Sequence, residues 1–329
     1  MKELLEVRHL QTSFIKNKNR TDYTSDINFK IEQGETVGIV GESGSGKSIT
    51  ALSIMGLLPK NGVVSEGSIL FDGKNLLELS DKEMEKLRGN EISMIFQDTM
   101  SALNPVFTIG HQLIEAICIH YKVSKKKAYD LAVQLIKKVG LSRPEKIMKE
   151  YSFMLSGGMR QRAMIAMALC QNPKLLIADE PTTALDVTIQ AQIVRLLKEL
   201  REEYKMSILL ITHDMGLIAE MADKVIVMYA GEIVEETDVF HLFDDPRHPY
   251  TKALLESIPK VTDFHGRKLT SIPGTVPQNY QMIQGCRFRE RCPVAFEQCY
   301  FYHPELNMTE EGHKVRCFAV EKEGSLDES

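Results

Sequence analysis

Apolar residues along the chain fall into short continuous runs and longer stretches with helical spacing. The runs at 35–40, 174–179, 207–212 and 224–231 are rich in aliphatic and β-branched residues and predict buried strands. Residues 188–204 place apolar positions three or four apart, as do other stretches between the runs, and predict helices. This alternation indicates an α/β fold with a mainly parallel sheet covered by helices.

Two regions depart from the alternation. Over about 98–155 the strand signal stops and helical spacing dominates, which predicts a helical subdomain inserted into the sheet fold. Over 260–329 the pattern weakens into Pro, Gly and polar residues, and this tail carries four of the six cysteines. We therefore expect one large domain over 1–259 and a small Cys-containing C-terminal lobe over 260–329.

Composition narrows the class of protein. The chain has 329 residues, of which 43% are hydrophobic and 26% charged, as in globular proteins. A formal net charge of -5 gives no basic face for nucleic acid, so we expect no nucleic-acid partner. The sequence has neither an uninterrupted apolar run approaching membrane-spanning length nor an apolar signal-peptide core at its start. We expect a cytoplasmic protein with reduced thiols.

The stretch "GESGSGKS", from Gly41 to Ser48, matches the phosphate-binding pattern G-x-x-x-x-G-K-[ST]. It lies between a predicted strand and a predicted helix, where backbone N–H groups and the positive helix end favour phosphate. Lys47 brings a positive charge to the phosphates, and Ser48 brings a hydroxyl to Mg²⁺. The predicted nucleotide-binding residues here are Gly41, Glu42, Ser43, Gly44, Ser45, Gly46, Lys47, Ser48 and Ile49.

A second stretch, "LLIADEP", ends a predicted strand with Asp179 and Glu180. A strand that ends beside the phosphate-binding loop can bring Asp179 to Mg²⁺ and Glu180 to the attacking water. Taken alone, an acidic pair after a strand is also typical of a helix cap or a solvated turn. The preceding phosphate-binding pattern favours the catalytic interpretation.

With these two motifs and four more in order, residues 4–258 resemble the nucleotide-binding subunit of an ATP-binding cassette (ABC) transporter. The further motifs are "IFQD" with Gln97, the signature "LSGGMRQR" (Leu155 to Arg162), "ALD" (Ala184 to Asp186) and "ITHD" with His213. The family signature has Gln where this chain has Met159, so the resemblance gives that side chain no role.

The resemblance implies the roles of these residues. Glu180, His213 and Lys47 are the implied catalytic residues, and Ser48, Gln97 and Asp179 the implied Mg²⁺ ligands. In the family the signature of one chain closes over the ATP of a second chain, which implies that Ser156, Gly157, Gly158 and Asp186 contact nucleotide across a dimer. An aromatic residue near the N-terminus stacks on adenine, with Phe14 the first candidate and Tyr23 the second; either ring could instead pack on a sheet edge.

Four cysteines in the tail follow the pattern C-x5-C-x6-C-x17-C: Cys286, Cys292, Cys299 and Cys317. The spacing alone is consistent with a metal or cluster site, with unligated thiols in a packed lobe, or with disulfides, which the cytosol disfavours. The interleaved Arg287, Arg289 and Arg291 are expected to lower the thiol pKa values.

The tail stretches "HPYTKALLESIP", "IPGTVP", "GCRFRERCP" and "VRC" resemble the C-terminal extension of oligopeptide and dipeptide permease ATP-binding subunits. Some members of that group hold a [4Fe–4S] cluster on four such cysteines, which implies a structural cluster here. The resemblance also implies an ATPase that powers peptide import from the cytoplasmic face of the membrane. Its implied partners are two membrane permease subunits, a second and paralogous ATPase, and an extracytoplasmic peptide-binding protein.

Other functions remain open at this point. The chain could serve a nickel importer, or it could be a soluble ABC ATPase of translation or DNA repair, although such proteins usually carry paired cassettes. It could also be a redox or metal sensor whose ATPase reports the state of the cluster. The sequence does not identify the cargo, because cargo never touches an ATP-binding subunit.

Overall fold

The computed structural model describes residues 2–98, 102–183, 185–258, 272–309 and 312–321. The chain divides into two compact units. Unit 1 comprises Met1–Leu4, Ile31–Glu35 and Leu76–Ile211, and unit 2 comprises Leu5–Lys30, Thr36–Asn75 and Thr212–Ser329. The predicted domain boundary near residue 260 lies outside the described residues and stays a prediction.

Unit 1 contains three parallel strands in the order β8-β7-β6. They are β6 (Ile92–Ile95), β7 (Leu175–Asp179) and β8 (Ser207–Thr212), and every residue in them is buried. The register pairs Ile95 with Ala178 and Asp179 with Ile211. The aliphatic runs predicted β7 and β8 because a parallel strand covered on both faces needs apolar side chains on both.

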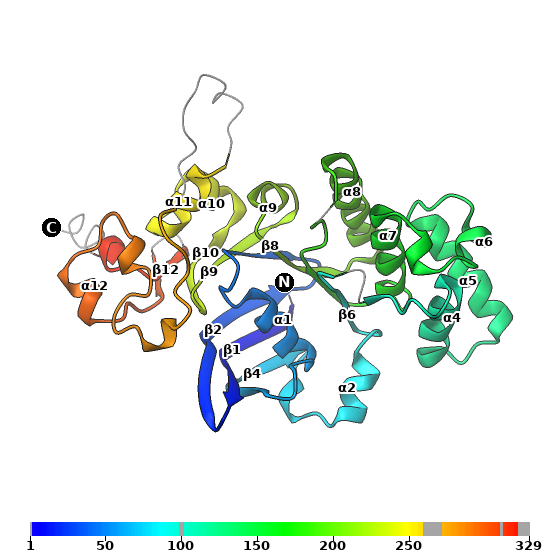
Figure 1. Cartoon of the computed structure of the whole chain (residues 1–329), viewed down its shortest axis with the longest axis horizontal. Coiled ribbons are helices and arrows are strands. Elements are labelled where there is room, and N and C mark those ends of the chain that lie inside the picture. The colour runs from blue at the N-terminus through cyan, green and yellow to red at the C-terminus, as the bar shows by residue number, and fades with distance from the viewer. Residues whose placement is uncertain (1, 99–101, 184, 259–271, 310–311, 322–329) are drawn as a thin grey trace, which may run out of the picture. The chain divides into compact units, whose positions relative to one another are not determined.

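The described residues between β6 and β7 are mainly helical and contain no named strand. The helices of unit 1 are α2 (Asp81–Leu87), α4 (Ile109–His120), α5 (Lys125–Lys138), α6 (Pro144–Ile147), α7 (Gly157–Ala168) and α8 (Val187–Tyr204). Helices α4 to α7 lie together, in green, in Figure 1.

Helices α4 and α5 pack through apolar positions four residues apart. Helix α5 buries Ala128, Ala132 and Ile136, while α4 buries Leu113 and Ile117 among others. Side chains at i and i+4 share one helix face, so each helix presents a stripe to its neighbour. Side-chain hydroxyls of Thr108 and Ser124 accept hydrogen bonds at the two N-termini and fix where the helices begin.

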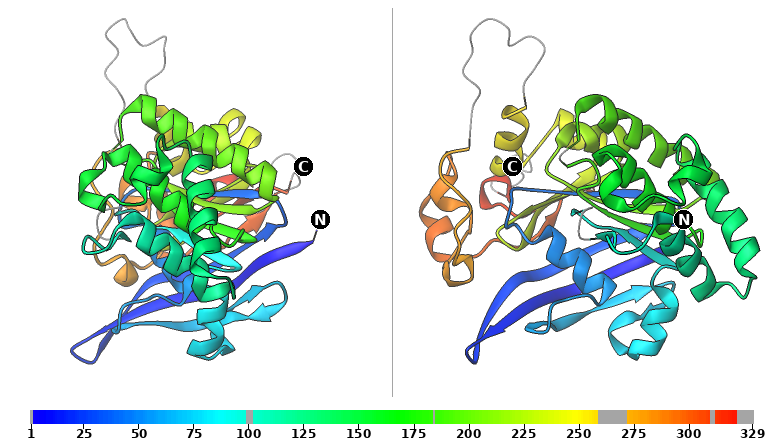
Figure 2. Two further views of the ribbon diagram at one scale, coloured as in Figure 1. Left: turned by 90° about the vertical axis from the view of Figure 1, so that its right-hand side faces the viewer. Right: turned by 45° about the vertical axis from the view of Figure 1, so that its right-hand side comes forward.

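Unit 2 contains an antiparallel sheet with strand order β2-β1-β4-β5, whose long strands run side by side in Figure 2. The strands are β1 (Glu3–Lys16), β2 (Asn19–Glu32), β4 (Gly62–Phe71) and β5 (Lys74–Asn75). The register of β1 against β4 shifts between Arg8 and Gln11. Helix α1 (Lys47–Met55) packs against β4.

A further row of hydrogen-bonded strands in unit 2 has the order β11-β12-β10-β9-β3 and is part of an eight-stranded sheet. Its strands are β3 (Thr36–Val40), β9 (Lys224–Tyr229), β10 (Glu232–Asp238), β11 (Asn307–Met308) and β12 (Lys314–Val315). Strands β3 and β9 are parallel, and the remaining neighbours are antiparallel. The C-terminal strand β12 therefore belongs to the same row of hydrogen-bonded strands as β3.

The shorter helices of unit 2 connect these strands and the C-terminal region. They are α9 (Met215–Met221), α10 (Val239–Asp244), α11 (Pro249–Glu256) and α12 (Glu297–Phe301). No helix in the described part of the chain combines the length and apolar character that a membrane span requires.

Candidate functional site

The phosphate-binding loop of unit 2 connects β3 to α1. Its first glycine, Gly41, has φ 151°, and a Cβ there would lie 2.2 Å from the main-chain oxygen of Met228. Its last glycine, Gly46, has φ 101° and sits at the N-cap of α1. The glycines are required because the turn passes close to another strand and enters the helix in a left-handed conformation. Helix α1 begins at Lys47, slightly earlier than the sequence predicts.

Lys47 is held across this loop. Its Nζ donates hydrogen bonds to the main-chain oxygens of Gly41 at 2.6 Å and Glu42 at 2.9 Å, and the residue is only 7% exposed. A buried ammonium group beside the N-terminal end of a helix creates a strongly positive spot. The loop therefore has the charge and the backbone shape that bind a phosphate chain.

The two candidate adenine-stacking residues form one aromatic pair. The ring centroids of Phe14 on β1 and Tyr23 on β2 lie 4.9 Å apart in an edge-to-face arrangement. The main chain of Tyr23 also approaches the loop, because a Cβ at Gly46 would lie 3.3 Å from the Tyr23 oxygen. The structure brings both aromatic residues to the unit that carries the phosphate-binding loop.

The acidic pair lies at the C-terminal end of β7 in unit 1, as predicted. Asp179 is 4% exposed and is the last residue of the strand. Glu180 has φ 51°, a conformation that is uncommon outside glycine. Its N–H donates to the Ile211 oxygen at 2.8 Å, and its Oε2 accepts a hydrogen bond from Thr183 Oγ1 at 2.9 Å. These contacts hold the carboxylate in one orientation at the strand end.

The signature serine and glycines meet the "ALD" segment in unit 1. Ser156 caps α7 by accepting a hydrogen bond from Met159 N, and Asp186 caps α8 by accepting one from Ile189 N. Both caps, together with Gly157 and Gly158, line one open pocket of about 440 Å³. The first residue of "ALD", Ala184, lies outside the described residues. Two helix N-termini that open into one pocket favour an anionic ligand.

The remaining candidates directly follow strands. Gln97 comes two residues after β6 and His213 comes one residue after β8, and both are exposed. The following Asp214 caps α9 by accepting hydrogen bonds from two main-chain N–H groups. The predicted site residues thus form two groups: the phosphate-binding loop, the aromatic pair and His213 in unit 2, and Gln97, the acidic pair, the signature and Asp186 in unit 1.

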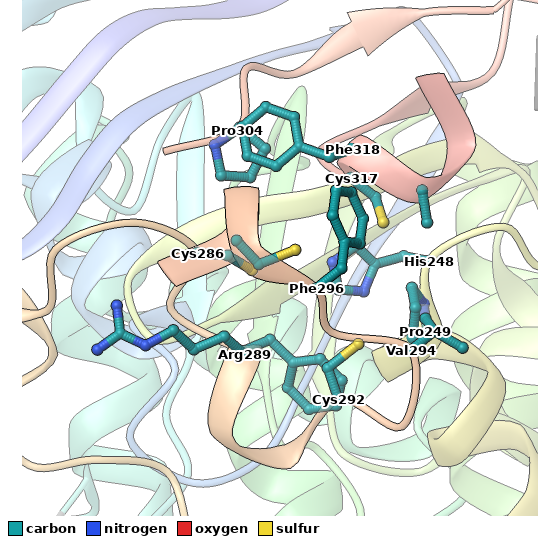
Figure 3. A pocket seen from close by; sticks show the side chains of 13 residues that line it. His248, Pro249, Cys286, Arg289, Cys292, Val294, Phe296, Pro304, Cys317 and Phe318 are labelled. Atoms are coloured by element: carbon teal, nitrogen blue, oxygen red, sulfur yellow. The ribbon is translucent and has the colours of Figure 1, made fainter. Parts of the chain in front are cut away.

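The prediction of an iron–sulfur cluster is wrong. Cys286, Cys292, Cys299 and Cys317 do line one cavity, together with apolar side chains such as Phe318 (Figure 3). That cavity has a volume of only about 10 Å³, which is no more than one water molecule needs. Among the residues that the structure describes, no group of three or more His, Cys, Asp or Glu side chains could hold a metal ion.

The expected effect of the arginines on these thiols is also wrong. Burial raises the pKa of Cys286 to about 12 and raises the pKa values of Cys292 and Cys317. Two of the three arginines are engaged elsewhere, since Arg287 pairs with Glu232 at 2.9 Å and Arg291 with Glu42 at 2.6 Å. The arginines that neighbour these cysteines in the sequence therefore do not lower the thiol pKa values. Sequence analysis missed the Arg291–Glu42 contact, because the two residues are 249 positions apart.

Comparison with known proteins adds to this geometry. Residues 24–183 match the family described as "ABC transporter", and residues 234–299 match "Oligopeptide/dipeptide transporter, C-terminal region". The oligopeptide transport ATP-binding protein AppD of Bacillus subtilis (strain 168) is 53% identical over 326 residues, covering 99% of both chains. The dipeptide transport ATP-binding protein DppD of Escherichia coli (strain K12) is 50% identical over 291 residues, covering 88% of this chain and 89% of DppD.

A solved structure has a similar fold. It is a dimeric, post-hydrolysis state of the ATP-binding cassette MJ0796 bound to ADP and Pi, with a TM-score of 0.65 and 28% sequence identity. The match covers 72% of this chain and 99% of that one. The ABC-type nucleotide-binding fold that the sequence resemblance implies is therefore confirmed, whereas the separate Cys-containing C-terminal lobe stays a prediction.

Proposed function

Because the chain belongs to the ABC transporter ATP-binding proteins of oligopeptide and dipeptide transport, we propose that it binds and hydrolyses ATP to drive peptide import through separate membrane permease subunits. The observation that carries this proposal is the phosphate-binding loop, with buried Lys47 held across it by two main-chain oxygens. The pattern of family matches supports peptides over nickel as the cargo class, since the C-terminal region also matches the peptide group.

Within the ATP site, residues 41–49 surround the phosphate chain. The main-chain N–H groups of the loop bind phosphate oxygens, and Lys47 neutralises their charge. Phe14 stacks on the adenine ring, with Tyr23 packed edge-to-face behind it. Ser48, Gln97 and Asp179 offer hydroxyl, amide and carboxylate oxygens, the ligand types that Mg²⁺ prefers, and the bound ion would offset phosphate charge.

Glu180 orients the attacking water. Its left-handed backbone conformation and its contact with Thr183 hold the carboxylate at the end of β7. A fixed carboxylate can accept a proton from water as the water attacks the γ-phosphate in line. His213 contacts the γ-phosphate and stabilises the charge that develops there.

Two chains complete two ATP sites. Ser156, Gly157, Gly158 and Asp186 line an open pocket at two helix N-termini, which suits the ATP of a second ATP-binding subunit. The dimeric state of the solved relative MJ0796 supports this arrangement. The second subunit is a paralogous chain, as the sequence resemblance implies. Closure on ATP and reopening after hydrolysis supply the movement that transport needs.

The helical region of unit 1 is the proposed contact with the two permease subunits. It exposes large apolar side chains, among them Val106 at 73%, Ile119 at 69% and Phe153 at 62%. Exposed apolar groups on one region indicate a protein-binding surface. The chain then acts at the cytoplasmic face of the membrane, and an extracytoplasmic peptide-binding protein delivers cargo on the other side.

The proposed chemistry is tested by Glu180→Gln. Glutamine keeps the shape of the side chain but cannot accept the proton, so we expect turnover to fall by about 100-fold or more while ATP still binds. The measurement is phosphate release by the purified transporter complex, with ATP binding measured by titration calorimetry. Glu199→Gln is the matched control, because Glu199 lies exposed on α8 and pairs with Arg195 on the same helix. Equal turnover in Glu180→Gln and the parent protein would show that the assigned chemistry is wrong.

A further inference from the structure

An arginine of the C-terminal segment, residues 272–309 and 312–321, contacts the phosphate-binding loop. Arg291 Nη1 lies 2.6 Å from Glu42 Oε2, and its Nη2 lies 3.0 Å from Glu42 Oε1. Arg291 is 8% exposed, although it lies in a short polar turn, Arg289–Arg291. The two parallel bonds form the bidentate pair that arginine makes with carboxylates, which fixes orientation as well as distance.

The guanidinium group of Arg291 is itself fixed. Its Nε donates to the Pro273 oxygen at 2.7 Å, and its Nη2 lies 3.4 Å from the Gly274 oxygen. Its central carbon lies 5.7 Å from the ring centroid of Tyr229 on β9. The group therefore meets Glu42 from a position that the surrounding chain determines, and it does not swing freely.

Glu42 transmits this position to the lysine of the loop. Its main-chain N–H donates to the Tyr250 hydroxyl at 2.9 Å, and its main-chain oxygen accepts the 2.9 Å hydrogen bond from Lys47 Nζ. A shift of Glu42 consequently moves one of the two main-chain oxygens that accept hydrogen bonds from the Lys47 ammonium group. The path from Arg291 to Lys47 passes through a single residue.

A second contact from the same segment reaches the other end of the loop. The Tyr280 hydroxyl donates to the main-chain oxygen of Tyr23 at 2.8 Å, and that oxygen lies beside Gly46. Nearby, Gly231 N donates to the main-chain oxygen of Ser45 at 3.0 Å. Arg287 donates to the main-chain oxygen of Ala230, the residue before Gly231, at 2.6 Å. The C-terminal segment thus supports the loop at both ends.

We infer that the C-terminal segment sets the nucleotide affinity of the phosphate-binding loop, with Arg291 as a positioning residue that acts through Glu42. Arg291 orders the loop before ATP arrives, which lowers the cost of binding. It also neutralises a carboxylate that would otherwise repel the phosphates. This inference rests on the proposed function, because it assumes that the loop binds ATP.

The test is Arg291→Met in the full chain. Methionine keeps much of the side-chain length but removes the charge and the donors, so we expect the Kd for MgATP to rise about tenfold, the loss that a charge-assisted bond predicts. Turnover at saturating ATP should stay near that of the parent protein, because a preordered loop favours ground and transition states alike. Arg291→Lys, which can keep one of the two bonds, should recover part of the affinity.

The matched control is Arg289→Met. Arg289 belongs to the same turn but donates to the main-chain oxygens of Gln284 and Tyr300, within the C-terminal segment. Its loss should disturb this segment while leaving the Glu42 contact in place, so ATP affinity should hardly change. An equal loss of affinity in Arg289→Met and Arg291→Met would overturn the inference, because it would indicate general loosening of the segment.

A double substitution separates position from charge. In Arg291→Met with Glu42→Gln, the unpaired carboxylate is gone, so ATP should bind more tightly than to Arg291→Met alone. If the changes in ATP-binding free energy caused by Arg291→Met and by Glu42→Gln simply add in the double variant, Arg291 does not act through Glu42. If Arg291→Met does not fold, Arg291→Lys serves as the test variant. A Kd for MgATP equal to that of the parent protein in Arg291→Lys would then reject the inference. Failure of the proposed function would appear separately, as absent ATP binding by the parent chain or as full turnover in Glu180→Gln.

Discussion

At the scale of single residues, Gly41 shows how closely the chain passes itself at the nucleotide loop. A Cβ at this position would meet the Met228 main-chain oxygen at 2.2 Å, whereas a Cβ at Gly73 would meet no atom within 4 Å. Both glycines have positive φ, 151° and 81°. The two positions therefore differ in crowding, but both have a positive φ, which disfavours residues other than glycine.

Replacing each glycine with alanine measures that crowding. We expect Gly73→Ala to lower the free energy of unfolding by about 1 kcal/mol through backbone strain alone. Gly41→Ala should cost about 3 kcal/mol or more, because a main-chain atom must also move. Urea unfolding followed by circular dichroism gives both values. Similar losses in the two variants would mean that the strand relaxes around the new methyl group.

The cysteines show what residue identity alone cannot predict. Their spacing and their arginine neighbours suggested a cluster with activated thiols, yet the four side chains line a cavity that fits no more than one water molecule. The size of a cavity depends on side chains from several segments, such as His248 and Phe318, and cysteine spacing carries none of that information. The correction also removes the basis for a redox or metal sensor.

At the scale of elements, strand β10 depends on partners far along the chain. Its three glutamates are buried and meet basic side chains of the C-terminal segment: Glu232 with Arg287 at 2.9 Å, Glu235 with His313 at 2.6 Å and Glu236 with Lys314 at 3.0 Å. A buried carboxylate is tolerated when it is paired and hydrogen-bonded. The stretch "EIVEETD" therefore forms a buried strand despite its charge.

This dependence explains which elements the sequence could predict. Strands β7, β8 and β9 are mainly aliphatic, so their own residues predict that they are buried. Strands β10 and β12 were not predicted. Their polar residues can be buried because they pair with each other, and the paired residues are about 80 positions apart in the sequence. Likewise, the phosphate-binding residues were found because their backbone and charge requirements are local, while the Arg291 contact is not.

Beside β10, His248 makes stability sensitive to pH. Burial lowers the pKa of His248 to about 4, and the charge of Arg316 acts in the same direction, while that of Glu235 opposes it. In the unfolded chain the pKa returns to about 6.5, so between pH 6.5 and pH 4 the unfolded state binds more protons. Stability should therefore fall as pH drops through this window, by up to about 1.4 kcal/mol per pH unit from this residue.

His248→Asn isolates this contribution. The His248 Nδ1 accepts a hydrogen bond from Tyr250 N at 3.0 Å and caps α11, and asparagine also caps helices well. Unfolding measured across pH 4 to pH 7 should have a shallower slope in the variant. An unchanged slope would show that other groups control the acid sensitivity.

At the scale of the whole molecule, the exposed apolar side chains predict how the subunit joins its transporter. Phe153 is 62% exposed on the helical region of unit 1, and Phe301 is 58% exposed in the C-terminal segment. We expect Phe153→Ser to reduce co-purification of the permease subunits while ATP binding persists, because apolar contacts at an interface contribute strongly to affinity. Phe301→Ser is the control of equal chemistry and should retain the permeases. Loss of the permeases in both variants, or in neither, would contradict this assignment.

The pairing of β12 with β10 has a consequence for anyone who would trim this protein to a minimal cassette. Cutting the chain before the tail would strip a hydrogen-bonded neighbour from β10 and remove Arg287, His313 and Lys314 from its three buried carboxylates. An edge strand without a partner can pair with the same strand of another copy. We therefore expect such a fragment to aggregate. The tail therefore belongs to the fold of unit 2, and a shortened version of this chain would need a substitute neighbour for β10.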